Sequence, residues 1–212
     1  MAGIGLWKVG GAGPLRFQVT DSIAERQLEE WIEQDPRLLE QGLEIVARQL
    51  RTAGGPLDLL GIDAQGRWVL IEIKRDRLRR EVLSQAIDYA SCLAGMDPQE
   101  LFGRCDAYLS DRAKPGLADL LRTRGATMNG EDGLEPVIYL VGTGIDTGLE
   151  RMVDYLSRTA NLSIRLVTFS VFAGLDGEIL LTREIHETDQ QCAQPATTSS
   201  ESIPSLDELQ AQ

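Results

Sequence analysis

The sequence of 212 residues contains a single histidine, His186, and this scarcity excludes several kinds of active site. A zinc site of the HExxH type needs two histidines, and a His-rich metal cluster needs more. A Ser-His-Asp or Cys-His centre would have to use His186 itself. Any metal ion is therefore expected on oxygen ligands, which suit Mg²⁺, Mn²⁺ and Ca²⁺.

Cysteines and long apolar runs are scarce as well. Cys92, Cys105 and Cys192 are odd in number and lack CxxC spacing, which argues against a disulfide framework or a cysteine-rich zinc site. No apolar run approaches the ~20 residues that a bilayer-spanning helix needs. The first residues, Met1 to Gly5, lack the basic start and apolar core of a signal peptide. These absences predict a cytoplasmic protein with no membrane partner.

Basic residues are fewer than acidic ones, 21 against 33, and the net charge is −12. Taken alone, this balance argues against nucleic acid binding, because phosphate is repelled by an acidic surface. The charge is segregated, however. Residues 184–212 contain six acidic side chains and no Lys or Arg, whereas residues 67–80 contain six basic and two acidic side chains. A local basic face therefore remains.

Hydrophobic periodicity predicts one α/β domain over residues 1–187. We expect the main strands at residues 43–50, 57–63, 68–74, 137–141, 164–172 and 178–182, with shorter ones at 6–9 and 15–19. We expect helices at residues 23–35, 78–94, 115–124 and 147–159. Asp97-Pro98 is interpreted as the end of the second helical region.

The last part of the chain, residues 188–212, has a different composition. Ser, Thr, Pro, Gln and acidic residues dominate it, which predicts a disordered acidic tail that is dispensable for folding. Ile203, Leu206 and Leu209 have turn-like spacing within it, so a peptide that binds a protein partner stays open.

The predicted strand 68–74 carries an unusual pair of charges. Glu72 and Lys74 lie two residues apart and therefore share one face, while Ile71 and Ile73 take the opposite face, toward the core. A solvated strand face with an ion pair is the plain interpretation of this pattern.

Asp58 favours a second interpretation. The midpoint between positions 58 and 72 is Gln65, which lies inside the predicted hairpin turn, so Asp58 is expected beside Glu72. A slip of one residue would put the two carboxylates on opposite faces, and the sequence leaves the register open. In the expected register two carboxylates and one ammonium group converge, and a divalent cation would relieve the repulsion between the carboxylates. This set of groups suits metal-assisted phosphodiester hydrolysis.

Further motif residues flank these strands in a fixed order. They are Asp58 ahead of Glu72-Ile73-Lys74, Glu25 on the preceding helix, and Gln85 with Tyr89 spaced QxxxY on the following helix. This order resembles the core of the PD-(D/E)XK nuclease superfamily, in particular its RecB-like branch. Residues 23–94 as a whole are similar to the catalytic domain of NucS-type endonucleases.

The resemblance implies a restriction-endonuclease-like fold, a mixed central sheet flanked by helices, with Mg²⁺ or Mn²⁺ as the cofactor. Asp58, Glu72 and the carbonyl of Ile73 would be the metal ligands. Lys74 would orient the attacking water or stabilise charge on the phosphorus. Glu25 would reach the metal directly or through water.

The same resemblance assigns roles to residues around this centre. Gln85 would hydrogen-bond near the active site or to DNA, and Tyr89 would pack against it and belong to the nucleic-acid-binding surface. The other expected DNA contacts are basic residues, because guanidinium groups suit phosphate recognition. They are Arg75, Arg77, Arg79 and Arg80, which follow Lys74 directly, and Arg48 on an earlier strand. A solvated helix start is the alternative for any one of these arginines.

The function expected from this resemblance is Mg²⁺-dependent hydrolysis of DNA by an endonuclease of repair, restriction or defence. A homodimer is expected on the same basis. The mismatch-binding N-terminal domain of NucS enzymes needs about a hundred residues, and only some twenty precede the recognisable core, so mismatch specificity is not carried over. Two alternatives stay open, a non-catalytic nucleic-acid-binding module and a regulatory interaction protein. The complete set of Asp58, Glu72 and Lys74 disfavours the first of them.

Overall fold

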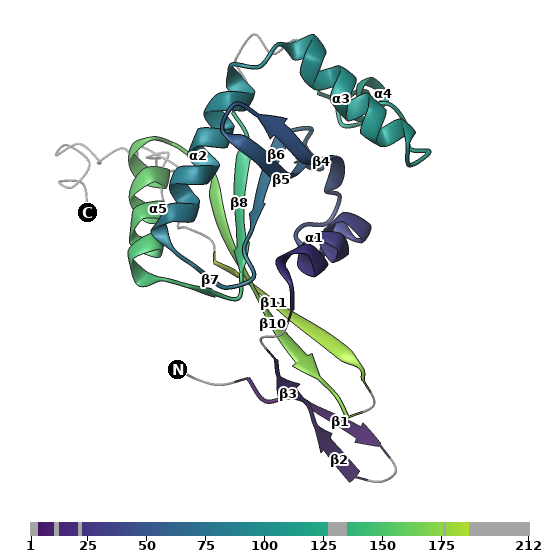
Figure 1. Cartoon of the computed structure of the whole chain (residues 1–212), viewed down its shortest axis with the longest axis vertical. Helices are drawn as coiled ribbons and strands as arrows, with labels where there is room; N and C mark the ends of the chain where they lie inside the picture. Colours follow the sequence, from purple (N-terminus) through teal and green to yellow (C-terminus); the bar gives the residue numbers. More distant parts are fainter. Residues whose placement is uncertain (1–3, 11–12, 21–22, 127–134, 176, 187–212) are drawn as a thin grey trace, which may run out of the picture.

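The computed structural model describes residues 4–10, 13–20, 23–126, 135–175 and 177–186. Over these residues, seven strands form one mixed sheet with the order β11-β10-β8-β6-β5-β4, and β3 pairs with β10 beside this path (Figure 1). The neighbours β6, β8 and β10 are parallel, and the remaining pairs are antiparallel. The strands are β3 (Gln18–Val19), β4 (Glu44–Thr52), β5 (Gly55–Ile62), β6 (Trp68–Ile73), β8 (Val137–Gly142), β10 (Ile164–Ala173) and β11 (Ile179–His186). The predicted disordered tail, 188–212, lies outside the described residues.

Helices cover both faces of this sheet. The helix α1 (Glu25–Gln34) and the short 3₁₀ helix η1 (Pro36–Leu38) lie on one face, and α2 (Arg80–Ala94) and α5 (Thr147–Thr159) lie on the other (Figure 1). The helices α3 (Pro98–Ser110) and α4 (Leu117–Thr123) complete the layer next to β4. The chain is thus a mixed α/β fold, as the sequence predicted.

Helix α3 is a correction to the sequence-based prediction, which ended the helical region at Asp97-Pro98. The Asp97 side chain accepts a hydrogen bond from the main-chain N–H of Glu100 at 3.0 Å, and Pro98 occupies the first helical position. Asp at the N-cap followed by Pro is a favourable helix start, because it satisfies a free N–H and fixes φ. The same two residues therefore begin a new helix after ending the previous region. The last strand is also longer than predicted and continues beyond Thr182 to His186.

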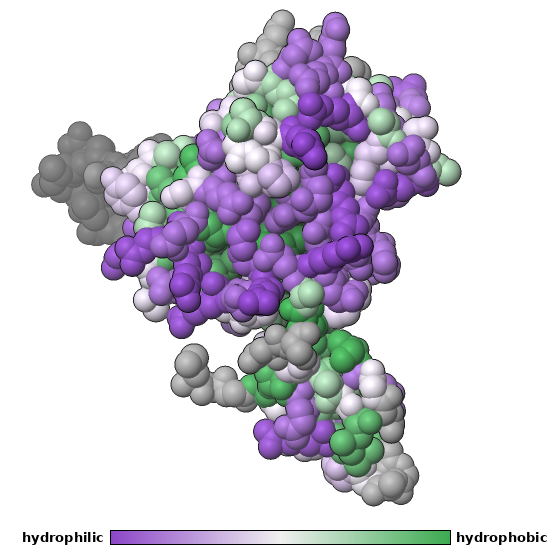
Figure 2. Space-filling view, in the orientation of Figure 1, coloured by the Kyte–Doolittle hydropathy of each residue, from purple (hydrophilic) through white to green (hydrophobic). Residues whose placement is uncertain are grey.

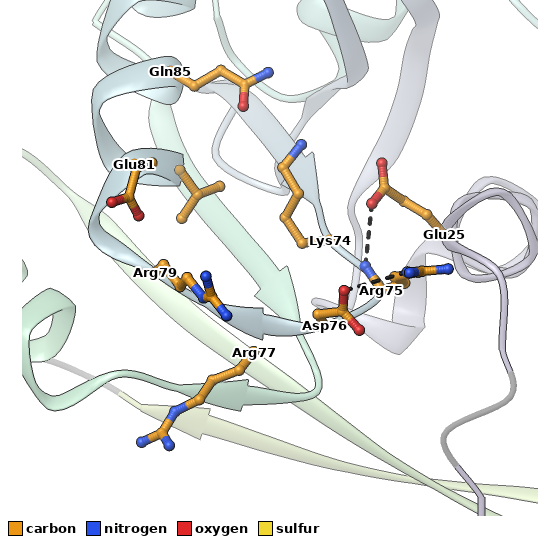
Figure 3. Close-up of a pocket in the computed structure, with 9 residues that line it drawn as sticks. Glu25, Lys74, Arg75, Asp76, Arg77, Arg79, Glu81 and Gln85 are labelled. Carbon is orange, nitrogen blue, oxygen red and sulfur yellow. Dashed lines mark hydrogen bonds and ion pairs between the residues drawn. The ribbon is translucent and has the colours of Figure 1, made fainter.

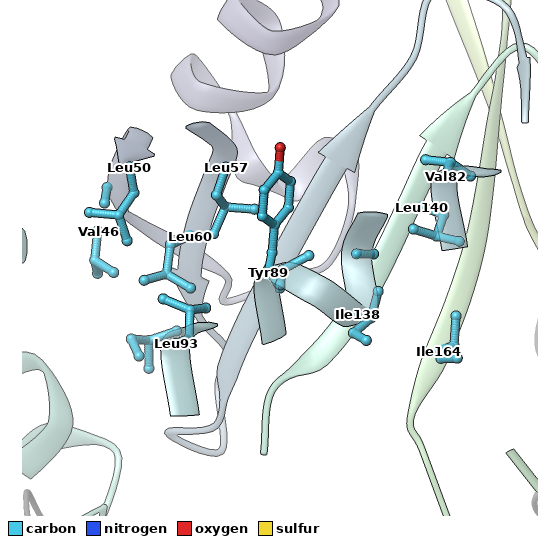
Figure 4. Packing of buried hydrophobic residues seen from close by; sticks show 14 of the residues in the cluster. Val46, Leu50, Leu57, Leu60, Val82, Tyr89, Leu93, Ile138, Leu140 and Ile164 are labelled. Carbon is cyan, nitrogen blue, oxygen red and sulfur yellow. The ribbon is translucent and has the colours of Figure 1, made fainter. Parts of the chain in front are cut away.

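Each face of the sheet has its own hydrophobic core. Helix α2 buries one stripe of side chains at helical spacing against β4, β5 and β8 (Figure 4). That stripe consists of Val82, Leu83, Ala86, Tyr89 and Leu93. On the opposite face, Leu28 and Ile32 of α1 pack on Ile71 and Ile73 of β6. Burying a side chain of this size contributes roughly 1.5–3 kcal/mol, so the two layers hold the sheet rigidly between them.

The β5–β6 hairpin has the register that the turn position predicted. Leu59 pairs with Ile71 and Leu60 with Leu70, and the ladder ends there, so Asp58 and Glu72 are the first residues beyond its last pair. The turn is held by Asp63, whose carboxylate accepts hydrogen bonds from the main-chain N–H groups of residues 65 and 67 at 2.9 Å. The two carboxylates that the sequence singled out therefore come from neighbouring strands.

Asp63→Ala is expected to lower the free energy of unfolding by roughly 1–3 kcal/mol, because it removes the hydrogen bonds from two turn N–H groups, each with a net value of about 0.5–1.5 kcal/mol. The side chain is fully buried and also binds the Arg67 guanidinium at 2.6 Å. Urea unfolding followed by circular dichroism measures the loss. Asp119→Ala, which breaks an exposed ion pair with Arg122, serves as the control and should cost less than about 1 kcal/mol. Equal losses in the two variants would contradict this role for Asp63.

The N-terminal strands form an arm at one end of the sheet. Strand β1 (Trp7–Gly10) pairs with β2 (Gly13–Arg16), and the arm continues the projecting ends of β10 and β11 (Figure 1). The predicted strand 15–19 is interrupted at Phe17, whose ring is buried. Hydrophobic side chains gather on this arm, whereas the visible face of the body is mainly hydrophilic (Figure 2). No helix in the described part of the chain is long and apolar enough to span a bilayer.

Candidate active site

Asp58 lies where the ladder between β5 and β6 ends. Its Oδ2 accepts the main-chain N–H of Ile73 at 2.8 Å, so a carboxylate oxygen replaces the carbonyl that a continued ladder would supply. The next N–H, of Lys74, donates to Val141 O on β8 at 2.8 Å. Because the C=O and N–H of one trans peptide group point in opposite directions, and the Lys74 N–H points to β8, the Ile73 carbonyl is directed toward β5, the side on which Asp58 lies. These two oxygen donors therefore occupy the open end between the strands.

Glu72 and Lys74 share a face of β6 and form an ion pair, as the period of the strand predicted. The Lys74 Nζ donates to Glu72 Oε1 at 2.7 Å. The Glu72 side chain is 1% exposed, whereas that of Lys74 is 33% exposed, so the pair is not a solvated strand face. Glu72 Oε2 is the one fully buried side-chain polar atom among the described residues that has no hydrogen-bond partner. A buried oxygen of this kind is costly unless a cation or a proton reaches it.

Burial and like charge shift the ionisation of this cluster. Burial, together with the negative charge of Asp58, raises the pKa of Glu72 to about 7, although Lys74 partly opposes the shift. Burial also raises the pKa of Asp58, against the opposing hydrogen bond from Ile73. Burial lowers the pKa of Lys74, but the carboxylates of Glu72, Glu25 and Asp58 raise it above its ordinary value overall. The three groups predicted to converge therefore interact electrostatically in one place.

A pocket of about 830 Å³ opens beside Lys74, between α1 and the start of α2 (Figure 3). Its lining combines acidic, basic and amide side chains, and it is formed by Glu25, Lys74, Arg75, Asp76, Arg77, Arg79, Glu81, Val82 and Gln85. Glu25 reaches it from α1, and its Oε2 accepts the main-chain N–H of Arg75 at 3.2 Å. The Lys74 side chain extends between Glu25 and Gln85 (Figure 3). Asp58 and Glu72 are not among the lining residues, and Lys74, which binds Glu72, connects them to this polar opening.

Gln85 and Tyr89 lie one turn apart on α2, and Gln85 Nε2 donates to the Tyr89 hydroxyl at 2.8 Å. Gln85 lines the pocket. Tyr89 is only 3% exposed and belongs to the core beneath α2 (Figure 4). A buried ring offers no face for stacking on a base, so the predicted nucleic acid contact of Tyr89 is wrong. Its hydroxyl holds the Gln85 amide, so the other predicted role of Tyr89, to pack and hold Gln85, is confirmed.

The arginines that follow β6 divide into two groups. Arg75, Arg77 and Arg79 line the pocket and lie on its lower rim in Figure 3. Arg77 Nε donates to the carbonyl of Ile145, which pins the stretch β7 (Arg77–Leu78) beside β9 (Gly144–Ile145). Arg80 begins α2 and is not among the lining residues. The basic segment therefore gives the pocket a positive edge.

Arg48 does not join this edge. Its Nε binds Glu29 Oε1 at 2.7 Å and its Nη1 binds Glu33 Oε2 at 2.6 Å, both on α1. Two carboxylates already neutralise its charge, so the predicted phosphate contact of Arg48 would compete with these ion pairs. Its ion pairs fix α1 against β4 instead.

Two residues at this site, Gln49 and Glu29, are not part of the predicted set. Gln49 Nε2 donates to Asp58 Oδ1 at 3.1 Å and to Glu29 Oε1 at 3.0 Å. Glu29 lies four residues after Glu25 and hence on the same helical face, a signal that could have identified it. Nothing in the local pattern singles out Gln49, because its contact with Asp58 depends on pairing between two strands.

The carboxylates present fit a divalent cation only in part. No group of three or more His, Cys, Asp or Glu side chains in the described ranges is placed to hold a metal ion. Mg²⁺, however, is commonly bound by one or two carboxylates, with water and substrate phosphate as the other ligands. Asp58 and Glu72 supply two carboxylates, and the buried Glu72 Oε2 has an unused lone pair. The site therefore suits Mg²⁺ or Mn²⁺ that keeps several water or phosphate ligands.

Comparison with known proteins agrees with the motif pattern. Residues 24–97 match the family model of the endonuclease NucS C-terminal domain. Endonuclease NucS of Methanocaldococcus jannaschii is 33% identical over 66 residues, which are 31% of this chain and 25% of the relative. Endonuclease NucS of Pyrococcus furiosus is 32% identical over 76 residues, 36% of this chain and 28% of the relative. The resemblance to the NucS catalytic domain is confirmed over this segment.

The similarity is local. The chain spans about a quarter of the length of these two relatives. Among solved structures, one titled as an EndoMS-dsDNA2 complex aligns with 78% of this chain and 64% of its own, at 15% sequence identity and a TM-score of 0.41. The segment that matches the family model, residues 24–97, contains Glu25, Asp58, Glu72, Lys74 and Gln85.

Proposed function

We propose that this protein is a metal-dependent nuclease of the PD-(D/E)XK type, RecB-like branch, that cleaves phosphodiester bonds within DNA. The observation that carries the proposal is the buried, unpartnered Glu72 Oε2 on the side chain that binds Lys74, which itself lines a pocket with a basic edge. A protein that used these residues for stability alone would gain little from a buried oxygen without a partner. The local similarity to relatives named endonuclease NucS supports the same reaction class.

Asp58, Glu72 and the Ile73 carbonyl are the proposed ligands of Mg²⁺ or Mn²⁺. When bound, the cation supplies a water of lowered pKa and neutralises charge on the phosphate. Asp58 is suited to this role because its two oxygens are held by Ile73 N–H and the Gln49 amide. Glu25 lies across the pocket, and its charge acts on Glu72. There its carboxylate can accept a hydrogen bond from a water molecule bound to the cation.

Lys74 has the role of a fixed positive charge in this scheme. Its ammonium group is oriented by Glu72 Oε1, and its pKa is held above the ordinary value, so it remains charged at neutral pH. A preorganised cation lowers the energy of negative charge that develops on the phosphoryl oxygens. Gln85, held by Tyr89, presents its amide to the same space. Arg75, Arg77 and Arg79 are placed to bind phosphates of the strand on either side of the scissile bond.

Cleavage of a DNA panel tests this proposal. Circular single-stranded DNA, supercoiled plasmid, linear duplex and flap substrates are incubated with Mg²⁺ or Mn²⁺, and an EDTA sample is the control. We expect metal-dependent cleavage that includes the circular substrates, since an endonuclease needs no free end. Binding with a steep salt dependence but without cleavage would favour the binding module instead. Absence of both binding and cleavage would overturn the proposal.

A further inference from the structure

Gln49 lies directly opposite Asp58 in the pairing of β4 and β5. Arg48 pairs with Leu59 and Leu50 with Leu57, so Gln49 and Asp58 face each other between these two pairs. The Gln49 amide nitrogen bridges Asp58 Oδ1 at 3.1 Å and Glu29 Oε1 at 3.0 Å. Ionised carboxylates only accept hydrogen bonds, so the amide must present its NH₂ group to both of them. Its two N–H bonds are thereby fully used.

The backbone at Gln49 is held in a conformation that strands do not favour. Its φ is 48°, in the left-handed region that non-glycine residues rarely adopt. Residues two apart in a regular strand share a face, yet Arg48 binds α1 whereas Leu50 is buried in the core beneath α2. The change of face therefore occurs at Gln49. Because Gln49 itself is exposed, no packing of its own side chain compensates for the unfavourable φ.

The bridge fixes the orientation of the Asp58 carboxylate. Oδ1 accepts from Gln49 and Oδ2 accepts from Ile73 N–H, so each oxygen has one donor and keeps a free lone pair. A neutral amide can hold the group without cancelling its charge, which a lysine or arginine would do. Gln49 thus leaves Asp58 fully available to a cation.

The other end of the bridge is firmly anchored. Glu29 is buried and binds Arg48 at 2.7 Å, and Arg48 also binds Glu33 at 2.6 Å. Glu33 accepts hydrogen bonds from the Tyr108 hydroxyl at 2.7 Å and from Arg112 at 2.6 Å. Tyr108 lies in α3, and Arg112 follows its C-terminal end. The orientation of Asp58 is therefore supported by α1 and α3 as well as by its own hairpin.

We propose that Gln49 is a positioning residue that orients Asp58 for a divalent cation. The inference rests on the proposed function, since it assigns Asp58 to that cation. Groups that hydrogen-bond a metal ligand typically change metal affinity 10–100-fold when removed. Gln49 differs from the ligands themselves, because its loss leaves every ligand in place.

Gln49→Gly tests the assignment, because glycine accepts a φ of 48° and removes only the amide side chain. We expect the dissociation constant for Mn²⁺, measured by calorimetry without DNA, to rise about 10–100-fold. We also expect the cleavage rate at saturating Mn²⁺ to differ from the wild-type rate by no more than about threefold, because all the metal ligands remain. Asn161→Gly is the matched control, because Asn161 also has a positive φ, 52°, and lies between α5 and β10. It should leave Mn²⁺ affinity unchanged.

The outcomes separate the inference from the proposed function. Unchanged Mn²⁺ affinity in Gln49→Gly, beside a wild type that binds Mn²⁺ and cleaves DNA, would overturn the positioning role alone. A wild type that neither binds Mn²⁺ nor cleaves would overturn the proposed function first. Gln49→Asn is a second variant that tolerates the same backbone but whose amide is one methylene too short. The same loss of affinity is expected for it, and wild-type affinity in both variants would again overturn the role.

Discussion

Lys74→Ala is expected to slow DNA cleavage by about 10²–10³, because one preorganised electrostatic stabiliser of the transition state is lost. Mg²⁺ binding should stay intact or become slightly tighter, since the variant removes a positive charge that lies 2.7 Å from Glu72. Single-turnover cleavage rates and calorimetric Mg²⁺ titrations measure the two effects separately. A fall in rate without a fall in affinity would place Lys74 in the chemical step.

Two further variants sharpen this test. Lys114→Ala removes another lysine of similar exposure, 34%, that binds a strand glutamate, Glu44, at 2.5 Å. It lies outside the pocket and should cleave at the wild-type rate. Asp58→Ala should lose metal affinity and activity together, unlike Lys74→Ala. Equal rates for Lys74→Ala and the wild type would remove Lys74 from the mechanism and leave a resemblance of fold only.

Most of the sheet could be predicted from the sequence because its strands are short apolar runs between clear turns. The hairpin register followed from one turn position, and the pairs Leu59–Ile71 and Leu60–Leu70 confirm it. Helix α3 was missed because Asp-Pro ends one segment and caps the next equally well. The N-terminal arm could not be predicted as an arm, since alternation in a strand does not show which partner strand it joins.

The site divides in the same way. Glu72 and Lys74 are neighbours along one strand, so a period of two was enough to place them together. Arg48 and Tyr89 carried the right chemistry for a nucleic acid contact, but ion pairs with α1 engage the first and the core encloses the second. Gln49 could not be predicted from the sequence, because its role depends on a left-handed φ and a cross-strand partner. Local patterns thus identified the chemical groups, and long-range packing decided which of them are available.

Glu72→Gln is expected to abolish cleavage and yet stabilise the metal-free protein. Glutamine keeps the shape of the side chain but loses the charge that a cation needs, so the cleavage rate should fall by at least ~10²–10³. In the wild type, burial and the charge of Asp58 raise the pKa of Glu72 from an ordinary value of 4.5 to about 7. The folded state therefore keeps a proton that the unfolded state has already released, and metal-free stability falls as the pH rises from 4.5 to about 7.

Above about pH 7 the wild type has lost all of the stability that depends on the Glu72 proton. Glutamine avoids this loss because it cannot ionise. We expect Glu72→Gln to be more stable than the wild type by roughly 2–3 kcal/mol in EDTA at about pH 8, and nearly equal to it at about pH 4. Urea unfolding at the two pH values measures the difference. Glu44→Gln is the control, because Glu44 is a strand carboxylate paired with a lysine but 30% exposed, and it should change neither cleavage nor the pH dependence. A Glu72→Gln variant that is less stable than the wild type in EDTA above pH 7 would mean that the Lys74 ion pair outweighs the burial of Glu72, and that the buried carboxylate is retained for stability rather than for a cation.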